Sequence, residues 1–205
     1  MDKTVYVFLG WLLGIAAITI EDYIRRRIRS AQIGKSVDLE LQELRFLMAA
    51  IALNMRMRQG RVTREFLTWF QPIAQGHDGL DPRVSEFLPK IREMPEDELN
   101  KVLLSFRRPN AGVQLNEHSL PFLASLAGDV AVLPAELQRD LWRVKLQLDL
   151  FNQQTCFLRG QFDKTFDESL SEANRRSVQT NLDEGYTRIG DRAEGIARII
   201  TDSIH

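Results

Sequence analysis

An uncharged run near the start of the chain limits its possible folds more than any other feature. Residues 4–20 contain no Asp, Glu, Lys or Arg. A helix of this length spans about 25 Å, slightly less than the roughly 30 Å hydrocarbon core of a bilayer. A cluster of arginines follows within nine residues. The pattern predicts a single transmembrane anchor over residues 1–24.

Two other interpretations fit part of this pattern. A cleaved export signal would use small residues such as Gly14 and Ala16, but it needs positive charge before the apolar run, where only Lys3 lies. A core helix of a soluble protein normally carries a polar face, which residues 5–18 lack. The retained anchor accounts for both the apolar run and the charges after it.

The arginine cluster predicts the orientation of the anchor. Positive charge resists translocation, so the chain after the anchor is expected in the cytoplasm, at the cell (inner or plasma) membrane. A basic juxtamembrane segment over residues 25–35 is expected to contact lipid headgroups, where each Lys or Arg contributes about 1 kcal/mol. The arginines assigned to this contact are Arg25, Arg26, Arg27 and Arg29.

Charge is distributed unevenly along the chain. Residues 21–64 hold ten basic and five acidic residues, whereas residues 163–202 hold six basic and nine acidic residues. The formal net charge of the whole chain is only −1, and no aromatic side chains alternate with Arg25–Arg29. We therefore expect membrane lipids, and not nucleic acid, to be the partner of the basic end.

Small residues predict self-association of the anchor. Gly10, Gly14 and Ala17 share one face of a helix at a spacing of four and three residues. Small side chains allow two helix backbones to approach closely in lipid, where packing replaces the hydrophobic effect. A span slightly shorter than the bilayer also favours oligomers. A homo-oligomer formed through this face is the expected state.

The rest of the chain is expected to be all-α, because no run alternates as a β-strand does. A break is expected at 32–36, followed by a helix that begins at Val37 and ends at Gly60. Thr63 is expected to cap the next helix, and Ser119 with Pro121 to open one ending near residue 133. These short helices form the predicted bundle over residues 36–133.

Residues 134–205 are predicted to form two long helices. Each has an apolar seam at heptad spacing, which is typical of coiled coils and of bundle cores. The polar stretch 167–177 could be a turn or continuous helix; a hairpin is favoured, because the seams can then face each other. The seams are Leu137, Leu141, Val144, Leu148, Phe151, Thr155, Leu158, Phe162 and Thr165, and then Leu182, Tyr186, Ile189, Ala193, Ile196 and Ile200.

Catalytic and metal-binding motifs are not evident in the sequence. His77, His118 and His205 have no ligand partners at zinc-site spacing. Cys156, the only cysteine, lies on a seam-bearing helix without a nearby histidine, so a buried thiol is expected. We predict no metal, no cofactor and no enzymatic activity.

One segment supports an alternative. Residues 198–205 resemble the Arg-x(4–6)-His element of the HEPN family of helical-bundle ribonucleases, with Arg198 and His205 in the two positions. The resemblance implies a membrane-anchored ribonuclease that cleaves RNA phosphodiesters, with these two residues as the catalytic pair. The chain departs from the family in having Ile199 where a polar residue is usual, and in ending at His205.

The sequence as a whole predicts a single-pass membrane scaffold. The anchor localises the chain, and the basic segment orients it. The long C-terminal helices of the cytoplasmic bundle present a surface to another copy of the chain, through their seam, or to a protein partner. A pore-forming defence effector built from oligomerised anchors is the other alternative.

Overall fold

The computed structural model describes residues 3–77, 79, 82–105, 115–126, 130–167 and 169–203, with side chains omitted at 3–10, 12–15, 82–85 and 96–97. All regular structure in these ranges is helical, which confirms the all-α prediction. The elements are α1 (Lys3–Gln59), α2 (Arg64–Gln75), α3 (Pro82–Arg92), α4 (Glu96–Ser105), α5 (Pro121–Ser125), the 3-10 turn η1 (Val130–Val132), α6 (Ala135–Lys164) and α7 (Glu172–Ser203).

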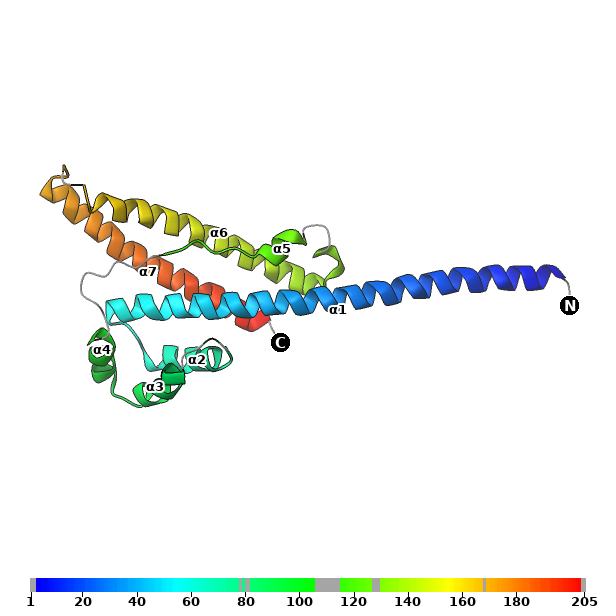
Figure 1. Ribbon diagram of the computed structural model, residues 1–205, viewed down its shortest axis with the longest axis horizontal. Helices are drawn as coiled ribbons and strands as arrows, with labels where there is room; N and C mark the ends of the chain where they lie inside the picture. Colours follow the sequence, from blue (N-terminus) through cyan, green and yellow to red (C-terminus); the bar gives the residue numbers. More distant parts are fainter. Residues whose placement is uncertain are drawn as a thin grey trace.

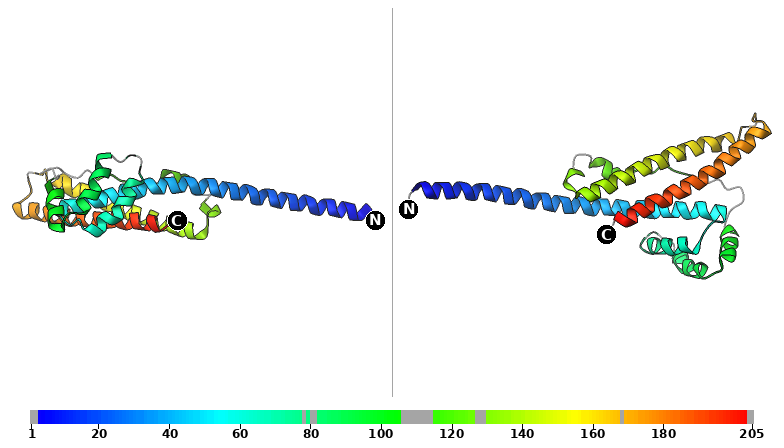
Figure 2. Two further views of the ribbon diagram at one scale, coloured as in Figure 1. Left: turned by 90° about the horizontal axis from the view of Figure 1, so that it is seen from below. Right: turned by 180° about the vertical axis from the view of Figure 1, so that it is seen from behind.

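Helix α1 determines the shape of the molecule. It has 57 residues, which corresponds to a length of about 85 Å. Its C-terminal half lies inside a bundle, with α6 and α7 on one side and α2–α4 on the other, while its N-terminal half projects away (Figures 1 and 2). The first buried residue of α1 in the described part of the chain is Ile33.

The break expected at 32–36 is wrong, because α1 continues through these residues. Gly34 lies within the helix, where glycine costs about 1 kcal/mol relative to alanine. Ile33, Val37 and Leu41 are all buried at a spacing of four residues, so one face packs continuously across the glycine. From Lys3 onward, the residues assigned to the anchor, the basic segment and the first bundle helix therefore lie in one continuous helix.

The apolar arc of α1 is buried only in part. Leu44, Met48 and Met55 are buried, but Leu39 and Leu47 are 56% and 40% exposed. Helix α7 packs along one side of α1, whereas α2, α4, α5 and η1 make shorter contacts with it. The C-terminal half of α1 thus contacts several elements of the bundle, and its side chains between these contacts are exposed to solvent.

The connection from α1 to α2 follows the sequence prediction. Gly60 has a φ of 62°, the left-handed conformation that glycine adopts without strain. The Thr63 hydroxyl accepts a hydrogen bond from the Phe66 N–H at 3.2 Å and caps α2. The Asn100 side chain of α4 pairs with both backbone groups of Val62, at 3.1 and 3.2 Å. These contacts fix α2 and α4 to the end of α1.

The helix expected from Ser119 to residue 133 is wrong. Only the five residues of α5 and the short turn η1 are helical in the described part of this segment. Leu120 holds the N-cap position of α5, but its side chain makes no capping hydrogen bond. Instead, the Glu40 carboxylate of α1 accepts hydrogen bonds from the N–H groups of Phe122 and Leu123, at 2.8 and 3.0 Å. The cap comes from a residue 82 positions away, so the local sequence carries no sign of it.

Helices α6 and α7 form an antiparallel hairpin, as predicted (Figure 1). Most seam residues are buried, so the seams are used within the chain. Helix α7 lies between α6 and α1 and packs on both. A Cβ at Gly185 would collide with Leu158 of α6, and a Cβ at Gly190 would lie 2.7 Å from the Cβ of Met55 of α1. Both glycines thus allow close helix approach, on two different faces of α7.

Candidate interaction surfaces

The first candidate surface is residues 16–32 of α1, here called the projecting stretch. None of its residues is buried, and residues 16–29 are all exposed. Surface helices of soluble proteins normally bury an apolar stripe, so exposed apolar groups on several sides of one helix are unusual. The large apolar residues are Ile18, Ile20, Tyr23, Ile24 and Ile28, between 49% and 66% exposed.

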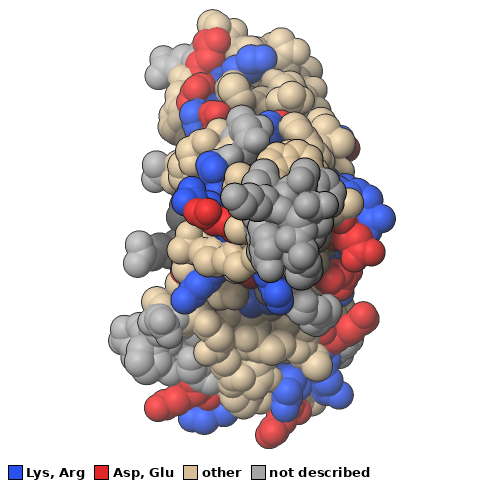
Figure 3. Space-filling model, turned by 90° about the vertical axis from the view of Figure 1, so that its right-hand side faces the viewer, with Lys and Arg blue, Asp and Glu red and all other residues tan. Residues whose placement is uncertain are grey.

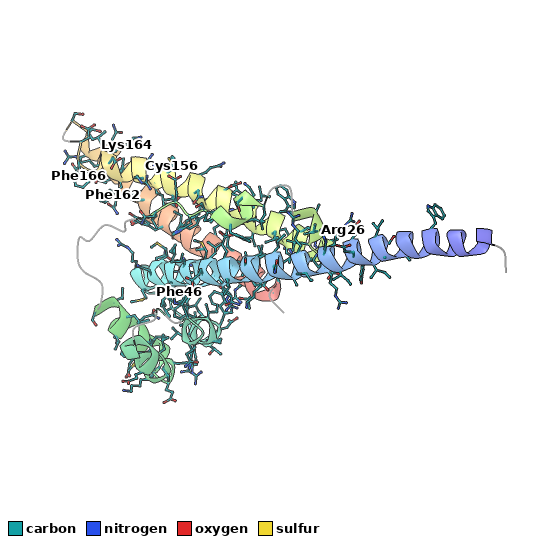
Figure 4. All side chains as sticks on the ribbon, turned by 45° about the vertical axis from the view of Figure 1, so that its right-hand side comes forward. Arg26, Phe46, Cys156, Phe162, Lys164 and Phe166 are labelled. Carbon is teal, nitrogen blue, oxygen red and sulfur yellow. The ribbon has the colours of Figure 1, made fainter. Side chains whose placement is uncertain are left out.

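The four arginines assigned to lipid headgroups all lie on the projecting stretch and are exposed. Because successive residues are about 100° apart on a helix, Arg25, Arg26, Arg27 and Arg29 spread over about 200° of its circumference and leave a side of about 160° without arginine. Arg25 also forms an ion pair with Glu21 one turn earlier. Figure 4 shows Arg26 on α1 beyond the bundle.

The end of the bundle nearest this stretch has mixed charge. Figure 3, seen from the side toward which α1 projects, shows basic and acidic side chains interspersed over the bundle. At this end of the described structure, positive charge is therefore most concentrated at the four closely spaced arginines of α1. Their position at the base of the apolar run is what interaction with an anionic surface requires.

The residues predicted to form the small-residue face are only partly described. Gly10 and Gly14 lie outside the residues whose side chains the structure describes, and Ala17 is exposed at the start of the projecting stretch. No helix of the described part of the chain contains a segment long and apolar enough to cross a membrane.

A carboxylate held between two arginines joins three helices. Arg56 of α1 donates two hydrogen bonds to Glu194 Oε2, at 3.0 and 2.6 Å. Arg198 donates to Glu194 Oε1 from Nε at 2.9 Å, with its Nη2 at 2.7 Å from the same oxygen. The guanidinium of Arg56 lies 4.8 Å from the Phe66 ring centre, and that of Arg198 lies 4.6 Å from the Trp69 ring centre. Each cation is thus satisfied by a carboxylate and by an aromatic face of α2.

These contacts bear on the ribonuclease alternative. Arg198, one half of the suggested catalytic pair, makes an ion pair and an aromatic stack typical of a residue that holds helices together. His205, the other half, lies outside the described residues. The structure therefore describes a structural role for Arg198, and its pairing with His205 stays a prediction.

The two described histidines have structural contacts. His77 stacks on Phe46 with ring centres 3.7 Å apart, accepts the Gly79 N–H at Nδ1 and contacts Glu43 Oε2 through Nε2 at 3.0 Å. Since Nδ1 accepts a hydrogen bond, Nε2 carries the proton that is donated to Glu43. His118 is half-buried, and this burial lowers its pKa. No cluster of three or more metal-binding side chains is present among the residues described.

A cavity of about 620 Å³ lies between α6 and the segment that contains α5. Leu120, Leu123, Leu141 and Leu148 contribute apolar walls, and His118 also lines the cavity. Lys145 and Asp149, also in the lining, form an ion pair at 2.8 Å. Its size and mixed lining suit a small, mainly apolar ligand. This cavity could not be predicted from the sequence, because its walls come from segments without a local motif.

The outer face of α6 carries exposed apolar side chains. Trp142, Leu146 and Phe157 are 64%, 58% and 54% exposed, and at about 100° per residue they lie within about 60° of one another. Cys156 is exposed on the same side of α6, where Figure 4 labels it, so the expected buried thiol is wrong. The preceding residue, Thr155, occupies the buried seam. Cys156 is one position further along the helix and therefore points away from the seam.

Comparison with known proteins assigns no family to this chain. No protein-family model, no curated protein and no solved structure matches it.

Proposed function

We propose that this protein is a single-pass membrane-anchored helical scaffold. Residues 1–24 hold the chain in the membrane, Arg25–Arg29 contact lipid headgroups, and the bundle lies in the cytoplasm. The scaffold associates with copies of itself and presents its cytoplasmic surface to a protein partner.

The projection of α1 from the bundle carries this proposal. A helix buried in its own fold would place its most apolar residues against other helices. Among the α1 side chains that the structure describes, the first buried one is Ile33, after the uncharged run and the arginines. The exposed isoleucines of the projecting stretch continue the apolar character of residues 4–20. Removal of such a surface from water stabilises by about 25 cal/mol per Å², which favours insertion in lipid.

Deletion of residues 1–24 tests the anchor. These residues precede every described buried residue, so the truncated bundle is expected to keep its helical circular dichroism and its melting transition. We expect the full chain to remain with membranes after an alkaline carbonate wash, and the truncated chain to be soluble. A truncated chain that still sediments with membranes contradicts the anchor, as does release of the full chain by carbonate.

Self-association is proposed through Gly10, Gly14 and Ala17. Replacing both glycines by isoleucine would separate the helix backbones, so we expect a smaller particle by light scattering in detergent. The matched control replaces Leu9 and Leu13 by isoleucine. Each of these leucines directly precedes one of the two glycines, and its side chain is already large. An unchanged particle size for the glycine variant contradicts this face.

The outer face of α6 supports the proposed protein partner. Exposed Trp and Phe are enriched where proteins bind each other, and Trp142 and Phe157 lie on one side of α6. A photoreactive residue at position 146 is expected to cross-link a defined partner in native membranes. The exposed Arg176 of α7 is the control position, and equal cross-linking at both positions contradicts the α6 surface.

A further inference from the structure

The projecting stretch is a helix that the bundle does not cover. Between Ala16 and Gln32 no side chain is buried, although the stretch contains four isoleucines. Isolated helices in water are marginally stable, and most helix stability in proteins comes from packing of an apolar face. A surface that covers one face of this stretch would therefore stabilise it.

One face of this stretch follows a heptad pattern. Ala17, Glu21, Ile24, Ile28 and Ala31 succeed one another at spacings of four, three, four and three residues. This alternation has a period of 3.5 residues, the repeat that keeps a seam facing a partner helix. Toward the N-terminus the same register includes Gly14 and Gly10.

The bundle leaves this face open. Ile33 and Val37, which pack into the bundle, lie about 140° around the helix from Ile28 and Ile24 respectively, at 100° per residue. Ile24 and Ile28 are 49% and 54% exposed. A second helix can therefore lie along the heptad face without contact with the bundle.

We propose that the projecting stretches of two copies of this chain form a parallel two-stranded coiled coil along this seam. This inference rests on the proposed membrane anchor, because insertion in one orientation makes the two helices parallel. Each Ile24 then faces its counterpart, as the self-complementary patch of a two-fold dimer requires. The small Gly10, Gly14 and Ala17 extend the same contact into the membrane, where close backbone approach stabilises pairs of helices.

The seam contains one like-charge contact, Glu21 with Glu21 of the other copy, and an arginine of the same helix offsets it. Glu21 is the only acidic seam residue, and it is already paired with Arg25 of its own helix. Arg26 lies about 180° from Ala17 and so points away from the partner helix. In a parallel pair the flanking positions bring Arg25 near Ile20 of the other copy and Arg27 near Gln32, so arginines do not oppose each other.

Single-cysteine cross-linking in native membranes tests the seam. In a Cys156→Ser background, Ile24→Cys and Ile28→Cys place thiols in the seam, while Arg26→Cys is the matched control on the opposite face. A disulfide requires Cα atoms about 4.4–6.8 Å apart, so we expect covalent dimers to form at least about tenfold faster at 24 and 28 than at 26. Equal rates at all three positions, or no dimer at any, overturn the proposal.

A second measurement does not depend on thiol chemistry. Ile24→Glu with Ile28→Glu should abolish the dimer by light scattering in detergent, whereas Arg26→Glu should retain it. Neither isoleucine packs in the bundle, so the melting transition of the bundle is the folding control. A double variant that stays dimeric contradicts the coiled-coil seam but leaves the membrane anchor intact. A wild-type chain that leaves the membrane fraction contradicts both the anchor and the coiled coil.

Discussion

Arg56 of α1 and Glu194 of α7 are joined by two hydrogen bonds although they lie 138 positions apart in the chain. Both bonds reach the same carboxylate oxygen, and Arg198 occupies the other oxygen. The Glu194 side chain is only 11% exposed. This contact links the long first helix directly to the last helix of the bundle.

Removal of this carboxylate should destabilise the fold. Glu194→Ala leaves two partly buried guanidinium groups without their anion, so we expect the free energy of unfolding to fall by about 2–3 kcal/mol. A larger loss is not expected, because Arg56 and Arg198 are 26% and 44% exposed. Urea denaturation measures the change. Glu184→Ala is the control, because its pair with Arg188 is exposed, and the change there should stay below about 0.5 kcal/mol.

Two glycines of α7 should respond in opposite directions to alanine. At Gly190 the new Cβ would lie 2.7 Å from the Met55 Cβ, which cannot move without its backbone, so we expect a loss of about 1–3 kcal/mol. At Gly195 a Cβ meets nothing within 4 Å, and alanine should stabilise the helix by up to about 1 kcal/mol. Thermal melting measures both changes, and we expect a lower melting temperature for Gly190→Ala than for Gly195→Ala. Equal melting temperatures would contradict the close approach of α1 and α7.

The buried hydroxyl of Thr155 offers a stabilising change. Its side chain is fully buried in the seam, and its Oγ1 has no hydrogen-bond partner in the described structure. Thr155→Val keeps the shape and removes an unsatisfied polar group, so we expect about 1 kcal/mol of added stability by urea denaturation. Thr180, whose exposed hydroxyl donates to the Arg176 carbonyl, is the control. A destabilised Thr155→Val variant would show that the hydroxyl is satisfied.

The stability of the bundle should depend on pH through His118. Burial lowers the pKa of His118 below its ordinary value of 6.5, so the unfolded chain binds this proton first as the pH falls. The free energy of unfolding should therefore decrease from pH 6.5 down through the lowered pKa of the folded state. Denaturation at pH 7.5 and 5.5 should show a smaller pH effect in His118→Gln than in the wild type. The same pH effect in both would exclude His118 as its source.

Local sequence signals predicted local structure well. Gly60 and Thr63 marked a helix end and a helix start because glycine and threonine satisfy backbone groups next to them in the chain. The heptad seams predicted the α6–α7 hairpin, because burial follows helical period. Cys156 was misplaced by a single position, since neighbouring helical residues point about 100° apart.

Contacts between distant residues could not be predicted in this way. Glu40 caps α5, Arg56 binds Glu194, and Trp69 stacks on Arg198. None of these long-range pairings leaves a pattern in one sequence, whereas the Glu194–Arg198 pair follows the local spacing of four residues. The break expected near Gly34 failed for the same reason, because burial of Ile33 and Val37 offsets the glycine. Arg25–Arg29 and Ala17 are exposed on the projecting helix, and their contacts with lipid or with another copy of the chain stay predictions.

The depth of Trp11 in a bilayer tests the membrane anchor most directly. Trp11 lies in the uncharged run and is 62% exposed in the protein alone. In a Trp69→Phe, Trp142→Phe variant it is the only tryptophan, and its fluorescence can be read in vesicles whose lipids carry nitroxides on the acyl chain or on the headgroup. We predict a blue-shifted emission that acyl-chain nitroxides quench more strongly than headgroup nitroxides. Emission typical of tryptophan in water, unquenched by acyl-chain nitroxides, would contradict the anchor.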